Sequence, residues 1–354
     1  EKLQWLNENP LSDIEFEHIQ PDKSNNWINH SFNNYESLID LKRIFECTAP
    51  GVNTAKDEWL FDFDTTNLLD KMKYFTKTYN ELIHNGTKNY PKLIKWSAGL
   101  KLHFVKKELA VFDKKLIREF QYRPYTGLFY YSDKLLSDRL TSNHYAFFGD
   151  SLQMENLAIN ISGNGASKPF AALITDKLSG FDFLEKTQIL TLYRYNENNE
   201  RIENISNWGL NQFTKEYRTK KIKKNEIFHY VYAILNNPTY RKKYELNLKR
   251  EFPRIPFYKD FKKWSDWGKA LIELHLNYEK AKPYSLIVNT DKTIIEPKCK
   301  LKADTENGVI IIDEATIISK IPAEVWDYKL GNRSALEWIL DQYKESKPKD
   351  PTLR

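Results

Sequence analysis

Residues 225–241 read NEIFHYVYAILNNPTYR, and their periodicity decides what kind of fold the chain builds. Apolar side chains recur at Ile227, Phe228, Val231 and 234–235, which is the spacing of one helix face. Asn225 is a residue type that caps helices, and Pro238 lacks a backbone N–H, so we predict a helix that begins at 225 and ends before 238. The apolar stretch is far too short to span a bilayer, which favours a buried helix.

The segment around this run is strongly basic. Residues 215–254 carry twelve Lys or Arg against four Glu, a local charge of +8, whereas the whole chain has a net charge of +6. Such a surface suits a polyphosphate partner, because phosphate contacts supply most of the affinity in nucleic-acid binding. The alternative is a solvated helix face above core tyrosines. The candidates for phosphate contact are Lys220, Lys221, Lys223, Lys224, Lys242 and Lys243.

Outward from this run, helical and extended patterns alternate. Helical spacing follows Thr66, a predicted N-cap, and recurs over 261–278 and after Ser334, which forms a capping box with Glu337. Residues 100–135 alternate as strands do, and residues 149–180 are loop-rich with short strands. Asn307-Gly308 indicates a β-hairpin between 294–302 and 309–312. We therefore predict an α+β fold, with short strands in the N-terminal half and a helical C-terminal half that contains a hairpin.

The predicted organisation has one main unit. At 354 residues with 41% apolar content, the chain is long enough for real cores. We predict a connector over 1–50, a target-recognition domain over 51–346 with a sub-boundary near 215, and a frayed tail over 347–354. Residue 1 opens without Met, as in a fragment of a longer polypeptide. Cys47 and Cys299 are far apart, which fits a reducing cytoplasm.

Catalytic constellations are weak. Asp62 and Asp64 share a strand parity, which is more typical of a solvated face than of paired catalytic acids. Asp291 followed by residues 296–298, EPK, imitates a metal-nuclease pattern, but Pro297 interrupts the strand that this pattern needs. The seven histidines show no metal-binding spacing, and neither a phosphate-binding P-loop nor the Asn/Asp-Pro-Pro-aromatic tetrapeptide of adenine methyltransferases occurs. We therefore expect no catalytic residue, no bound cofactor and no metal site.

Four blocks in order carry a family resemblance. They are 51–63, GVNTAKDEWLFDF; 122–139, which opens with YRPY and includes YYSD and the final Arg; 225–256, which ends in FPRIP; and 321–338, which opens with IPAEVWDYKLGNRS. Together they resemble the C-terminal specificity domain of Type ISP restriction–modification enzymes, single polypeptides that join nuclease, helicase, adenine methyltransferase and target-recognition parts. The chain departs from that pattern at Ala55, where relatives often have Gly, and at 192–195, LYRY, where they tend to carry PLYLY.

The resemblance implies a non-catalytic domain that binds double-stranded DNA in a sequence-specific way, in the cytoplasm, as part of a phage-defence enzyme. Its expected partners are upstream methyltransferase and helicase domains, with S-adenosylmethionine bound in the methyltransferase. Arg contacts guanine and Asn contacts adenine in direct base reading. The base-reading candidates are Asn53, Thr54, Lys56, Asp57, Arg123 and Arg139. For residues 53–57 the alternative is a plain surface turn, and for Arg123 a structural ion pair.

Two other functions remain open from the sequence. One is a structural coupler that docks onto helicase or methyltransferase domains, and the other is a nuclease module. Salt dependence separates the first from DNA binding, because phosphate contacts weaken steeply with salt.

Overall fold

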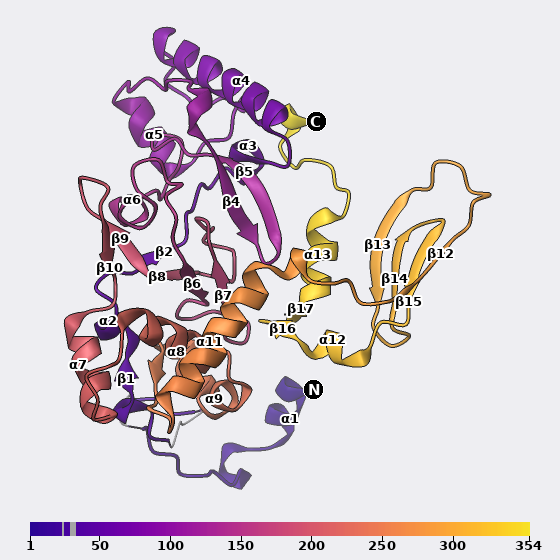
Figure 1. Ribbon diagram of the computed structural model, residues 1–354. Coiled ribbons are helices and arrows are strands. Elements are labelled where there is room, and N and C mark those ends of the chain that lie inside the picture. The colour runs from indigo at the N-terminus through magenta and orange to yellow at the C-terminus, as the bar shows by residue number, and fades with distance from the viewer. Residues whose placement is uncertain (23–24, 29–32) are drawn as a thin grey trace.

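The computed structural model describes residues 1–22, 25–28 and 33–354; residues 23–24 and 29–32, which fall in the predicted connector, lie outside this description. Figure 1 shows small antiparallel sheets and helices, with the sheet of β12 to β15 projecting to one side. The helices are α1 Lys2–Glu8, α2 Leu41–Ile44, α3 Asp57–Leu60, α4 Thr65–His84, α5 Ala98–Val105, α6 Ser142–Phe148, α7 Asn207–Glu216, α8 Lys224–Leu235, α9 Pro238–Lys243, α10 Glu245–Arg250, α11 Phe261–Leu276, α12 Ala323–Asp327 and α13 Ala335–Tyr343. The strands are β1 Ile39–Asp40, β2 Ala49–Pro50, β3 Phe61–Asp62, β4 Ile117–Arg123, β5 Thr126–Tyr131, β6 Ala158–Ile161, β7 Ala172–Thr175, β8 Gln188–Thr191, β9 Tyr193–Tyr195, β10 Arg201–Glu203, β11 Arg254–Ile255, β12 Ile287–Thr290, β13 Cys299–Asp304, β14 Val309–Asp313, β15 Thr316–Ser319, β16 Lys329–Leu330 and β17 Arg333–Ser334. The mixture confirms the predicted α+β class.

A buried four-stranded sheet lies between two hydrophobic cores. Its strand order is β2-β8-β6-β7, all antiparallel. Side chains alternate across it: Ala158 and Ile189 face the core formed with α4, α5 and α6, whereas Ile159 and Leu190 face the core formed with α7, α8 and α11. Because both faces are covered, β6 and β7 are buried at every position.

Residues 225–235 of the stretch 225–241 lie in α8, which packs on α11. The helix begins at Lys224, with Lys223 rather than Asn225 in the cap position, and ends at Leu235. Pro238 starts the next helix, α9, whose N-cap is Asn237. Gly268 of α11 permits the close approach, because a Cβ atom there would lie 1.9 Å from the carbonyl oxygen of His229. Tyr230 and Tyr232 are buried in this contact, so they act as core residues.

The predicted hairpin belongs to a larger sheet. β13 and β14 pair around the turn at 307–308, as predicted, but β15 and β12 extend them into a four-stranded antiparallel sheet. This sheet projects from the rest of the molecule (Figure 1) and packs through Ile310 against Trp326 of α12. α13 begins at the predicted capping box of Ser334 and Glu337.

One prediction of secondary structure needs correction. Residues 98–105 form α5, not a strand, since Leu100 and Phe104 are one helical turn apart and both are buried. Of the predicted connector over 1–50, Tyr35, Leu41 and Phe45 contribute to a hydrophobic core. The same core contains residues on both sides of the predicted sub-boundary near 215.

The predicted frayed tail, 347–354, contains a short turn. Residues 351–353 form a 3₁₀ turn, and Leu353 packs against the core that contains residues of α4. Figure 1 shows the C-terminus beside α3 and α4.

Candidate nucleic-acid interface

The loop of residues 51–57 is fixed to its neighbours by backbone hydrogen bonds. The N–H of Val52 donates to the carbonyl of Ser179 at 3.0 Å, and Phe181 returns a bond to Val52 at 2.8 Å. Gly51 is required here, because a Cβ atom would lie 2.3 Å from the carbonyl oxygen of Gly180. On the other side, the N–H of Arg139 donates to the carbonyl of Asn53 at 2.8 Å. Bonds from two sides thus fix the path of the loop backbone.

Side chains within the loop shape it further. The Asn53 Oδ1 accepts from the N–H of Ala55 at 3.0 Å, and Ala55 has φ +55°, a conformation that favours glycine. The Thr54 hydroxyl donates to Asp57 and accepts from the N–H of Lys56. Thr54 is buried, so it builds the loop, and the prediction that it reads bases does not fit its position.

Lys56 also turns inward, contrary to its predicted role as a base reader. Its side chain is fully buried, and its ammonium group donates to Asp138 at 2.8 Å and to the Ser97 hydroxyl at 2.6 Å. Burial lowers the pKa of Lys56, and its bond to Asp138 opposes that shift. An ammonium group held in this way cannot reach a base edge. Lys56 ties the loop to α5 instead.

The remaining candidates gather on one surface. Asp57 accepts from the Tyr122 hydroxyl at 3.2 Å, and the guanidinium of Arg123 lies 4.0 Å from the centroid of the Tyr122 ring. Arg123 makes no ion pair within the described residues, but its half-buried guanidinium donates to the carbonyl of Tyr122 at 2.9 Å. Arg139 is exposed, and its guanidinium has no partner in the described part of the chain. Three distant segments therefore place Asn53, Asp57, Arg123 and Arg139 side by side.

Tyr122 is the residue of this surface that the sequence did not identify. Burial raises the pKa of its hydroxyl to about 12, so it remains a hydrogen-bond donor at neutral pH. Tyr122 directly precedes Arg123 in the block 122–139. This position beside a candidate residue is the signal in the sequence that could have identified it.

The predicted phosphate contacts lie elsewhere. Lys220, Lys221 and Lys223 are exposed in the segment that joins α7 to α8, and Lys242 and Lys243 are exposed on α9. Lys224 is mostly buried and pairs with Glu203 at 3.5 Å, so it is less available. Figure 1 shows α7 and α9 at the end of the molecule opposite α3 and α4. The two sets of candidates do not form one compact patch.

The weak catalytic patterns have structural explanations. Asp64 caps α4 by accepting from the N–H of Asn67, a role predicted for Thr66, and Asp62 pairs with Lys71 at 2.9 Å. Asp291 and Glu296 are exposed and lie outside the strands, where Asp291 accepts from Thr293. Within residues 1–22, 25–28 and 33–354, no group of three His, Cys, Asp or Glu is arranged to hold a metal ion.

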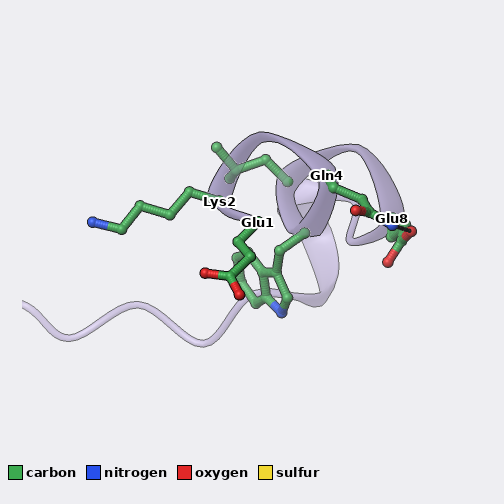
Figure 2. Close-up of a pocket in the computed structure, with 6 residues that line it drawn as sticks. Glu1, Lys2, Gln4 and Glu8 are labelled. Carbon is green, nitrogen blue, oxygen red and sulfur yellow. Dashed lines mark hydrogen bonds between the residues drawn. The ribbon is translucent and has the colours of Figure 1, made fainter.

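A hollow of about 630 Å³ lies along α1, and Figure 2 shows the side chains around it. Its lining comes from residues 1–8 alone, including the exposed Trp5 and Leu6, so no second element brings reactive groups to it.

Among the described helices, none has the length and apolar character needed to cross a membrane.

Comparisons with known proteins agree with this picture. Among solved structures, a cryoEM structure of a DrdV–DNA complex is similar with a TM-score of 0.93 and 37% identity, over 100% of this chain and 38% of that chain. A nuclease-deletion mutant of the Type ISP restriction–modification enzyme LlaGI, in complex with a DNA substrate mimic, gives 0.83 and 29%, over 97% and 33%. The ATP-dependent Type ISP enzyme LlaBIII, bound to DNA, gives 0.86 and 27%, over 97% and 23%.

The chain therefore spans between 23% and 38% of the length of these structures. A comparison with curated proteins finds no match. The family model described as the Type ISP C-terminal specificity domain matches residues 43–354. With nearly the whole chain matched, the protein belongs to the family of Type ISP C-terminal specificity domains.

Proposed function

We propose that this domain recognises a specific sequence in duplex DNA and directs the adenine-N6 methyltransferase of a larger Type ISP polypeptide to it. The observation that carries the proposal is the convergence of Asn53, Asp57, Arg123 and Arg139 on one surface. Arg side chains read guanine and Asn reads adenine, and each good contact contributes about 1–3 kcal/mol of discrimination. The three similar structures all contain DNA or a mimic of it.

The role of this domain is recognition, and the chemistry belongs to other parts of the polypeptide. Methylation of adenine requires the base to leave the stack, so a separate domain has to hold the duplex in register. We propose that the methyltransferase and helicase parts are partners, and that S-adenosylmethionine binds to the methyltransferase part. A DNA partner and the unpaired thiols of Cys47 and Cys299 fit a cytoplasmic location.

The test uses the complete multidomain protein. Sequencing of methylated sites in DNA from cells that express it identifies the target, and duplexes with and without that target then give specific and non-specific affinities. Arg123→Ala and Arg139→Ala should each lower the specific affinity by about 1–3 kcal/mol and leave the non-specific affinity unchanged. Lys134→Ala, which removes an exposed side chain nearby in sequence, serves as the control. Parental site profiles in all three variants would contradict the proposal.

A second function is supported by the N-terminal arm. Residues 1–22 have no buried side chain, yet Leu3, Trp5 and Phe16 are exposed by 79%, 51% and 70%. Apolar side chains gathered in this way favour a contact with another part of the polypeptide. The arm could therefore couple the domain to its neighbours in addition to its recognition role.

A further inference from the structure

A groove of about 620 Å³ adjoins the loop of residues 51–57, called here the recognition loop, and residues 55–57 form part of its lining. One wall is α3, which follows the loop, with Asp57 and Glu58; another is the segment that carries Lys92 and Lys95; and the tail supplies Lys349. No predicted DNA contact other than residues 56–57 belongs to this groove.

The tail forms its wall of the groove through specific bonds. The carboxylate of Glu58 accepts from the N–H groups of Lys349 and Asp350, both at 2.9 Å. The side chain of Asp350 accepts from the indole N–H of buried Trp59 at 2.8 Å. Thr352 donates to the carbonyl of Lys92 at 3.4 Å, which joins the tail to the opposite wall. The groove is therefore a built feature, and the tail holds Lys349 within it.

The acidic groups of the groove accept hydrogen bonds, and of its basic groups Lys56 is paired with Asp138, whereas three other lysines have no partner among the described residues. Glu58 and Asp350 accept the bonds just described, and Asp57 accepts from Thr54 and Tyr122. In contrast, the ammonium groups of Lys92, Lys95 and Lys349 have no hydrogen bond or ion pair within the described residues, and all three side chains are exposed. The three carboxylates keep their negative charge, but their hydrogen bonds hold them against the walls of the groove. The three free ammonium groups end long flexible side chains and can move to meet the phosphates of a partner.

We propose that this groove binds the phosphodiester backbone of the duplex on the flank of the bases read by the recognition loop, and that the tail completes the site. The proposal rests on the proposed function, because it takes duplex DNA as the ligand. Lysines contact phosphates as point charges, and such contacts fix register without reading sequence. The groove thus positions the duplex so that Asn53, Arg123 and Arg139 can meet base edges.

The test replaces Lys92, Lys95 and Lys349 together with Gln in the complete multidomain protein. Binding is measured over a salt series with a duplex that contains the target and one that does not. We expect affinity for both duplexes to fall about tenfold or more at 0.1 M salt, and the slope of log affinity against log salt to decrease by roughly 2–3, since each phosphate contact contributes about 0.9. The ratio of the two affinities should stay the same.

The matched control is the Gln variant of Lys292, Lys298 and Lys300, exposed lysines beside the projecting sheet. It changes the net charge equally, so an equal loss of affinity in this variant would overturn the proposal. If the parent prefers its target and the groove variant binds like the parent, the groove proposal fails and the proposed function stands. If the parent binds no duplex, both fail.

A second measurement does not depend on variants. Acetylation of lysines with and without a target duplex, read by mass spectrometry, should show protection of Lys92, Lys95 and Lys349 when DNA is bound. Full reactivity of all three in the complex would overturn the proposal. Deletion of 347–354 should lower affinity at least as much as Lys349→Gln, because it removes both the charge and the wall that holds it.

Discussion

At the scale of single residues, Lys56 shows how a residue that looks like a DNA contact can be a structural one. Its charge is satisfied by Asp138, a residue 82 positions away, and by Ser97. Removing one member of a buried pair leaves the other charge without compensation, which typically costs 3–5 kcal/mol; because Asp138 retains 16% exposure, we expect the lower end of that range.

The first prediction is that Lys56→Ala lowers the free energy of unfolding by about 3 kcal/mol and reduces methylation at every site together. Chemical denaturation gives the stability, and methylation-site sequencing gives the profile. Asp138→Asn in the same variant should recover part of the loss, because the unpaired charge is gone. A Lys56→Ala protein of parental stability with a changed set of sites would restore Lys56 as a base reader.

Asn53, on the recognition surface, should differ from Lys56, because a suitable substitution there should change which sites are methylated without lowering stability. Asn53 is half-buried, and its side chain holds the turn at Ala55, so Asn53→Ala loses both a base contact and a turn bond. Asn53→Asp keeps the acceptor for the N–H of Ala55 and removes the amide donor that pairs with adenine. We expect Asn53→Asp to alter the set of methylated sites at parental melting temperature, and Asn53→Ala to lower the melting temperature as well. If Asn53→Asp retains the parental sites, Asn53 does not read bases.

At the scale of elements, the basic segment between α7 and α8 lies far from the recognition loop, toward the end of the molecule opposite α3 and α4 (Figure 1). Lys220, Lys221 and Lys223 are exposed there, while Lys224 is held by Glu203. Replacing the first three with Gln should weaken binding to all duplexes alike and reduce the salt slope by up to about 3, whereas Lys224→Gln should change the slope little. A salt series with specific and scrambled duplexes provides the measurement. An unchanged slope in the triple variant would remove this segment from the interface.

Elements with strong local signals could be predicted from the sequence, and those defined by distant contacts could not. The helix after Ser334, the turn at 307–308 and α8 follow from caps, turn residues and periodicity. Residues 98–105 could not be assigned correctly, because the alternation of Leu102 and Phe104 also fits a strand. The helix is favoured by the N–H of Leu100, which donates to the capping hydroxyl of Ser97, and by the burial of Phe104. Of the candidate site, Arg123 and Arg139 follow from residue type and motif and stay predictions, whereas the inward turn of Lys56 depends on Asp138, a partner that no local pattern reveals.

At the scale of the whole molecule, a chain of hydrogen bonds joins the β4–β5 hairpin to the segment between α12 and β16. The hydroxyl of Tyr125, in the β4–β5 turn beside Arg123, lies 3.2 Å from that of Tyr328. Tyr328 contacts Nε2 of His275 at 3.0 Å, and Nδ1 of His275 contacts the Tyr232 hydroxyl at 2.5 Å. His275 thus connects α8 and α11 to the segment between α12 and β16, and its neutral form can take part in both bonds.

This arrangement makes stability depend on pH. Burial, and next the charge of Arg241, lower the pKa of His275 from its ordinary 6.5 to about 4. The unfolded chain therefore binds a proton near pH 6.5 while the folded chain does not. The contribution of His275 to stability is fully present above pH 6.5 and is lost as the pH falls toward 4, by up to about 3 kcal/mol.

The last prediction compares the parent with His275→Gln, a variant that keeps hydrogen-bonding groups but does not titrate. Other groups change with pH in both proteins, including His144 and His229, whose pKa values burial also lowers, so only the difference in unfolding free energy reports on His275. The advantage of the parent at pH 7.5 should shrink steadily below pH 6.5 and be smallest near pH 4. Chemical denaturation at four or five pH values measures it. Parallel stability curves for the two proteins would mean that the pKa of His275 is the same in the folded and the unfolded chain, and that the bonds of His275 to Tyr232 and Tyr328 do not require its neutral form.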